Sequence, residues 1–240
     1  MTRGASVAAA GFGLIAVCYG FARFAFGLLL PRMDADLALS STVTGLISSG
    51  SFVAYCLAIV LAVSCTERFG ARAVAVLAAL VAAIGMLGIA CAPSATWLAI
   101  SVFLAGSSTG LASPPLAVAV AASVARARQA AANTFINAGT SAGVVLSGPI
   151  ALMMGEAWRW AFVIFAAMAL AMAWFVFAAL PAGAAGRARQ SGRGLPGLNR
   201  ALKRLIFAAF LMGMASTAVW SFGGQAASRH LGLGHTQTSA

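Results

Sequence analysis

The sequence predicts an all-α protein that crosses a membrane several times. Three observations support this fold class: 62% of the residues are hydrophobic, only 8% are charged, and the apolar residues form seven stretches of about twenty residues each. Soluble domains carry roughly 25% charged residues, so this composition does not suit a protein surrounded by water. The stretches also lack the period-two alternation of a membrane barrel, which leaves helices to satisfy the backbone polar groups in lipid.

Each predicted span is long enough to cross the hydrocarbon layer, because a helix rises about 1.5 Å per residue and the layer is roughly 30 Å thick. The first stretch is longer than the apolar core of a signal peptide, which has roughly 7–15 residues, so we interpret it as a retained span. In chain order the predicted spans are 6–30, 43–64, 73–91, 97–121, 133–154, 160–180 and 205–225.

Basic residues are concentrated in alternate gaps between the spans. Cytoplasmic gaps of membrane proteins carry an excess of Lys and Arg, and this excess sets the orientation of the spans. The bias predicts that the N-terminus and the gap near 181–204 face the cytoplasm, and seven spans then place the C-terminus on the periplasmic side. One set of gaps holds Arg3, Arg68, Arg72, Arg126, Arg128, Arg187, Arg189, Arg193, Arg200, Lys203 and Arg204, and the other holds only Arg32, Arg159 and Arg229.

The charge and the cysteines favour neither nucleic-acid binding nor a metal site. The net charge is +11, but the basic residues are scattered through short gaps rather than gathered on one soluble face. The four cysteines lie far apart in apolar stretches or at their ends, as small buried hydrophobes do. The sequence also has no phosphate-binding glycine loop and no nucleophile–base pair, so it predicts no enzyme and no bound cofactor or metal.

Polar side chains are distributed unevenly among the first six spans. The third and sixth spans are almost wholly apolar, whereas the first, second, fourth and fifth carry hydroxyl groups, amides and one arginine. A helix that is apolar on all sides suits contact with lipid, and polar groups suit a bundle interior or a cavity. The pattern therefore predicts two triplets of spans, with the third member of each triplet outermost.

Several motifs resemble those of the major facilitator superfamily of secondary transporters. Residues 67–72 are similar to the family's loop signature Gly-x-x-x-Asp-Arg-x-Gly-Arg-Arg/Lys, which they match at Arg68, Gly70 and Arg72. The chain departs from that signature at Val63, Glu67 and Ala71. The glycine-spaced fourth span (103–114), Gly148-Pro149 in the fifth span, the aromatic start of the sixth (158–162) and residues 19–24 in the first are also similar to the family.

The resemblance implies an architecture and a function. The superfamily builds each six-span half from 3+3 inverted repeats. Residues 1–180 would then form the N-terminal six-helix half, 181–204 a basic cytoplasmic linker, and 205–240 the first helix of a truncated C-terminal half. We therefore expect an incomplete bundle whose missing C-terminal half is needed for function.

The implied function is alternating-access transport of a small solute across a bacterial inner membrane. The implied partners are membrane lipids and the unknown solute, and Gly148-Pro149 favours export. Proton coupling would depend on carboxylates elsewhere, because the acidic residues of this chain all lie in gaps. Two alternatives remain, a truncated membrane fragment that transports nothing and a small seven-span receptor.

Arg23 is the one charged residue inside a predicted span. An arginine at mid-membrane costs about 3 kcal/mol and normally needs a partner or water. Because the family's first span lines the central cavity, the resemblance implies that Arg23 could contact a polar or anionic solute. Snorkelling toward the outer surface and a bond between helices stay open as alternatives. The full set of cavity candidates is Tyr19, Arg23, Phe26, Ser108, Asn137, Trp220 and Gln225.

Two further groups of residues are assigned structural roles. Small residues allow helices to approach closely, and this predicts packing positions at Gly13, Gly20, Gly27, Gly106, Gly110, Gly139, Gly143, Gly148 and Pro149. The resemblance implies that the cytoplasmic loop after the second span latches the spans against the opposite half of the protein. The residues of this latch loop are Glu67, Arg68, Gly70 and Arg72.

Overall fold

The computed structural model describes residues 3–154 and 157–181, together with a few residues between 200 and 211. Most of the predicted linker (181–204) and most of the predicted seventh span (205–225) lie outside the described residues. Residues 3–154 and 157–181 form a bundle in which six helices are long and apolar enough to cross a membrane.

The first span is longer than its apolar stretch. Helices α1 (Arg3–Ile15), η1 (Ala16–Phe24) and α2 (Ala25–Leu37) follow one another without a break and form one helix of 35 residues, about 52 Å long. The sequence predicted an end at Leu30, but the helix continues through Pro31 to Leu37. Apolar residues mark the part of a helix inside the hydrocarbon, and the helix itself extends into the more polar region beyond.

The other five spans are helices close to the predicted ranges. They are α3 (Ser41–Phe69), α4 (Ala71–Ala90), α5 (Ala95–Ser123), α6 (Gln129–Met154) and α7 (Trp158–Ala179), with a short 3-10 turn, η2 (Arg126–Arg128), before α6. Serine side chains cap two of them: Ser40 accepts from the Val43 amide at α3, and Ser94 accepts from the Trp97 amide at α5. Between α3 and α4 a single residue, Gly70, adopts φ 87°, which allows an abrupt change of direction.

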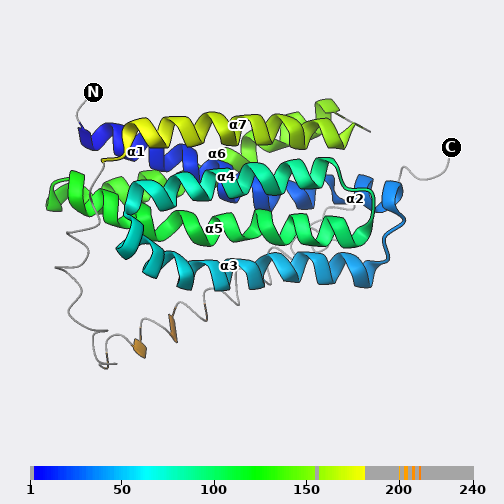
Figure 1. Cartoon of the computed structure of the whole chain (residues 1–240), viewed down its shortest axis with the longest axis horizontal. Helices are drawn as coiled ribbons and strands as arrows, with labels where there is room; N and C mark the ends of the chain where they lie inside the picture. The colour runs from blue at the N-terminus through cyan, green and yellow to red at the C-terminus, as the bar shows by residue number, and fades with distance from the viewer. Residues whose placement is uncertain are drawn as a thin grey trace, which may run out of the picture. The chain divides into compact units, whose positions relative to one another are not determined.

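The spans form one bundle in which two triplets interleave (Figure 1). The first triplet consists of the 35-residue helix, α3 and α4, and the second consists of α5, α6 and α7. Helix α3 packs on α5, and the matching pair in the other triplet is α6 on α1 and η1. Helix α4 packs on α5 as α7 packs on α1, while α4 and α7 pack on each other. Every contact between triplets thus has a counterpart, as expected for a 3+3 repeat, and the all-α class is confirmed.

Within the described bundle the third and sixth spans are more buried than the second and fifth, contrary to the prediction that they are outermost. In the membrane-spanning windows the buried share is 56% for α4 and 39% for α7, against 28% for α3 and 22% for α6. Helix α4 is rich in alanine and glycine, and Gly85 lies directly against the backbone of Ala105 on α5. Lipid tails and helix surfaces are both apolar, so apolar composition does not distinguish a lipid-facing helix from one packed on its neighbours.

Candidate functional site

The first span is irregular where it carries Arg23. Residues Ala16–Phe24 form the nine-residue π-helical segment η1, in which the hydrogen bonds follow the i→i+5 pattern. Such segments are rare and are frequently found at functional sites. Tyr19 and Arg23 both belong to η1, about one turn apart, so the segment determines where these two side chains point.

The Arg23 side chain lies over the aromatic rings of α3. Its guanidinium carbon is 4.1 Å from the centroid of the Phe52 ring and 4.9 Å from that of Tyr55. These distances are within the range of cation–π attraction. Within the described part of the chain, the Nε atom of Arg23 is buried and has no hydrogen-bond partner.

Tyr19, about one turn before Arg23, links η1 to α5 through its hydroxyl group. The Tyr19 hydroxyl is 3.0 Å from the Ser113 hydroxyl of α5 and forms a hydrogen bond with it. The Tyr19 and Tyr55 rings meet edge to face, with their centroids 6.4 Å apart. We call Tyr19, Arg23, Phe52, Tyr55 and Ser113 the Arg23 cluster. It joins η1, α3 and α5, and so draws on both triplets.

The Arg23 cluster is open on one side. The Phe52 side chain is 51% exposed, and Tyr19, Arg23, Tyr55 and Ser113 are half-buried. The arrangement provides one positive charge, aromatic faces and two hydroxyl groups in one place.

A comparison with protein-family models matches residues 12–240 to the Major Facilitator Superfamily. The chain belongs to this superfamily. A comparison with curated proteins gives no match. The family supplies the class of activity, which is transport across a membrane, and the chain is a multi-pass membrane protein of the major facilitator type.

The structure does not bring the remaining cavity candidates of this major facilitator protein to the Arg23 cluster. Phe26 and Ser108 are buried among packed helices, and the Ser108 hydroxyl donates to the carbonyl of Ala105 on its own helix. Asn137 is exposed, and its amide donates to the Asn133 carbonyl one turn earlier. Trp220 and Gln225 lie outside the described residues.

Sequence reasoning missed three members of the cluster, namely Phe52, Tyr55 and Ser113. Phe52 and Tyr55 are three residues apart, so they share one face of α3, and Tyr55 places a polar group in an apolar stretch. That spacing could have indicated an aromatic face on the second span. Ser113 had no comparable signal, because serines occur throughout the fourth span.

Glycines allow the first span to pack closely against α6. A methyl group added at Gly20 would overlap the backbone of Gly143, and one added at Gly139 would overlap the carbonyl oxygen of Phe12. Across the bundle, a methyl group at Gly106 would overlap the Ser51 side chain of α3. Gly110 lies equally close to the α3 backbone. These are close helix contacts of the kind that small residues permit.

Other predicted packing positions have different surroundings. Gly13 faces the Met172 side chain of α7, not α6, so it does not share a neighbour with Gly20. The π-helical segment begins between them and changes the angular spacing that a regular helix would give. At Gly27 and Gly148 there is open space around an added methyl group within the described bundle, and Pro149 is exposed on α6.

The latch loop ties α4 to the end of α7. Glu67 and Arg68 are exposed, whereas Arg72 is half-buried, and its Nε atom donates to the Leu180 carbonyl at 2.7 Å. Its guanidinium carbon also lies 5.2 Å from the Phe177 ring centroid. A positive charge at the carbonyl end of a helix interacts favourably with the helix dipole.

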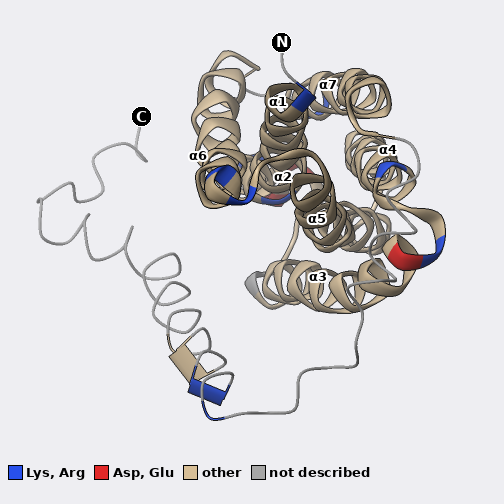
Figure 2. Cartoon of the chain, turned by 90° about the vertical axis from the view of Figure 1, so that its left-hand side faces the viewer, with Lys and Arg blue, Asp and Glu red and all other residues tan. Residues whose placement is uncertain are grey.

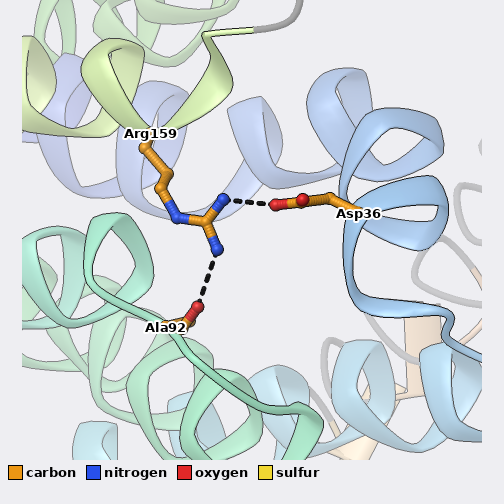
Figure 3. A network of polar contacts seen from close by, with 3 residues as sticks. All are labelled: Asp36, Ala92 and Arg159. Carbon is orange, nitrogen blue, oxygen red and sulfur yellow. Dashed lines mark hydrogen bonds and ion pairs between the residues drawn. The ribbon is translucent and has the colours of Figure 1, made fainter.

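Arg159 makes the equivalent contact at the other end of α4 and α7. Its Nη2 atom donates to the Ala92 carbonyl, just beyond the end of α4, at 2.9 Å, and its Nη1 atom pairs with Asp36 (Figure 3). Arg72 is the second residue of α4, and Arg159 is the second residue of α7. We call them the arginine pair. The arginine at the start of each helix thus donates to a carbonyl just beyond the end of the other helix, in agreement with the symmetry of the two triplets.

The ends of the bundle differ in charge. Arginine positions, coloured blue, are prominent at the end where α1, α4 and α6 begin (Figure 2). Glu67 lies at this end too, in the latch loop. The spatial grouping agrees with the alternate gaps identified in the sequence, because helices that begin at one end alternate with helices that end there.

Proposed function

We propose that this transporter moves a small solute by alternating access and that the Arg23 cluster lies on the solute path. The family supports the transport class, and members of this superfamily bind solutes near the bilayer midplane, between repeats. We further propose that it works in a bacterial inner membrane with its N-terminus in the cytoplasm, which the arginine distribution supports.

The observation that carries this proposal is the position of Arg23. It lies about 17 residues, or roughly 25 Å of helix, after the start of the apolar stretch at Ser6 and about seven residues, or roughly 10 Å, before its end at Leu30. A guanidinium inside the hydrocarbon costs up to about 3 kcal/mol on insertion scales. A charge placed there without a carboxylate partner among the described residues is the usual sign of a solute or ion pathway.

The test is solute binding to the chain in liposomes. The 240-residue chain is reconstituted, and binding of labelled organic anions, amino acids, sugars and organic cations is measured one class at a time. We expect saturable binding of at least one class, weakened about tenfold or more by Arg23→Gln and unchanged by Arg126→Gln at the exposed turn before α6.

A folded chain that binds none of these classes would contradict the proposal. It would favour the second candidate, a membrane fragment without transport activity. The specific reason to keep this candidate is the low burial of α3 and α6, which carry many exposed apolar side chains within the described residues. Circular dichroism of the same reconstituted samples separates loss of binding from loss of helix.

A further inference from the structure

We propose that the Arg23 cluster binds the carboxylate of a singly charged organic anion with a flat apolar body. This inference rests on the proposed function and names the substrate class of the same site. It combines three observations, namely an uncompensated charge, the aromatic faces beside it, and the absence of a second cation among the described side chains of the cluster.

The first step concerns the sign of the ligand charge. Asp34, Asp36 and Glu67, the acidic residues that the structure describes, lie at helix ends and not beside Arg23. The aromatic rings around the guanidinium are those of Phe24, Phe52 and Tyr55, and the neighbouring Tyr19 hydroxyl in η1 is bonded to Ser113. An arginine in this apolar setting favours an anion from outside, because pairing removes the unfavourable isolated charge.

The second step concerns the number of charges. One guanidinium neutralises one carboxylate, and the resulting pair carries no net charge. A dicarboxylate or a phosphate dianion would leave a negative charge in the apolar part of the bundle, and an organic cation would add a second positive charge. The site should therefore discriminate against both, for the same electrostatic reason that isolated charges are rare inside membranes.

The third step concerns the shape of the ligand. A guanidinium that rests its face on aromatic rings keeps its N–H groups at its edge, where they match the two oxygens of a carboxylate. The exposed Phe52 ring offers a flat apolar surface next to that edge. An aromatic or short aliphatic body could pack there, with the hydroxyl groups of Tyr19 and Ser113 within the same cluster as neutral partners.

The test compares molecules of one shape and different charge. The 240-residue chain is placed in phosphatidylcholine nanodiscs, and binding of labelled benzoate is measured by equilibrium dialysis. Benzamide, terephthalate, benzylamine and inorganic phosphate are then used as competitors. We expect benzoate to bind and the four competitors to bind at least about tenfold more weakly, which corresponds to about one lost charged hydrogen bond.

Variants connect the binding to Arg23. Arg23→Gln should abolish benzoate binding, and Arg23→Lys, which keeps the charge but loses the planar fork, should weaken it about tenfold. Arg126→Gln is the matched control at an exposed position and should bind like the parent chain. The conservative Lys variant keeps the experiment interpretable if Arg23→Gln does not fold.

Three results in phosphatidylcholine nanodiscs would overturn the inference. They are benzoate binding that Arg23→Lys leaves unchanged, equal binding of benzamide or terephthalate, and no benzoate binding by a folded chain. Loss of benzoate binding when phosphatidylglycerol is added would also overturn it, because the site would then hold a lipid phosphate. Arg23-dependent binding of a sugar or an organic cation in liposomes would leave the proposed solute site in place while this inference fails.

Discussion

Removal of the Arg72 side chain should loosen α7 from α4 measurably. The Nε atom of Arg72 donates to the Leu180 carbonyl at 2.7 Å, and the guanidinium lies near the Phe177 ring. A hydrogen bond from a charged donor stabilises by about 1.5–3 kcal/mol, and a cation–π contact at an exposed site adds about 0.5 kcal/mol. Since Arg72 is half-buried and partly screened by solvent, we expect Arg72→Gln to lower the free energy of unfolding by about 1–2 kcal/mol.

The assay is unfolding by sodium dodecyl sulfate in mixed micelles, followed by far-ultraviolet circular dichroism. Arg68→Gln is the matched control, because Arg68 is an exposed arginine in the same loop and contacts only its neighbour Phe69 among the aromatic rings. The control should change the free energy of unfolding by less than about 0.5 kcal/mol. Equal effects of Arg68→Gln and Arg72→Gln would refute the reasoning, because the loss would then reflect loop charge and not the contact with Leu180.

The double variant of the arginine pair tests whether the two contacts act independently. Arg72 and Arg159 hold opposite ends of α4, whose 20 residues span about 30 Å. Effects at sites so far apart add to within about 0.5 kcal/mol. Additive losses for Arg72→Gln and Arg159→Gln are therefore expected. A double variant no less stable than either single variant would show that α4 and α7 separate as soon as one end is free.

Three further predictions concern the bundle and its orientation. Gly20→Ala should destabilise the bundle by about 1–3 kcal/mol in the same assay because it overlaps Gly143, whereas Gly27→Ala, which meets open space, should not; equal effects would exclude helix contact as the cause. Tyr19→Phe should cost about 1 kcal/mol through loss of the bond to Ser113, and Ser113→Ala should cost the same; strictly additive losses in the double variant would contradict a shared bond. A membrane-impermeant maleimide should label the exposed Cys91 in intact cells, with Cys91→Ser as control; labelling only after lysis would reverse the orientation.

The fold class and the span positions could be predicted because lipid imposes them. A span must be long, apolar and helical, and these properties can be recognised in one continuous stretch of sequence. The ends could not be predicted with the same accuracy. The helix that carries Arg23 continues through Pro31 to Leu37. Its last turns are polar because they extend beyond the hydrocarbon, so the hydrophobic pattern does not mark where the helix ends.

The site could be predicted only in part. Arg23 and Tyr19 were identifiable because a charge or a polar ring is unusual in an apolar stretch. The partners Phe52 and Ser113 depend on how α3 and α5 pack against η1, and the π-helical hydrogen bonds of η1 have no sequence signature that we could use. The Arg72 bond to Leu180 joins residues 108 positions apart, and no local pattern indicates it.

The same nine residues that present Arg23 also pack closely against α6. Gly20 lies against Gly143 on one side of η1, while Tyr19 and Arg23 contact α3 and α5 on another. A segment pressed against α6 without intervening side chains has little room to shift, so it positions the guanidinium as a rigid support would. Movement during transport should then occur between whole bundles rather than within η1. The glycine contacts thus serve the site indirectly, because they fix the backbone from which the charge projects.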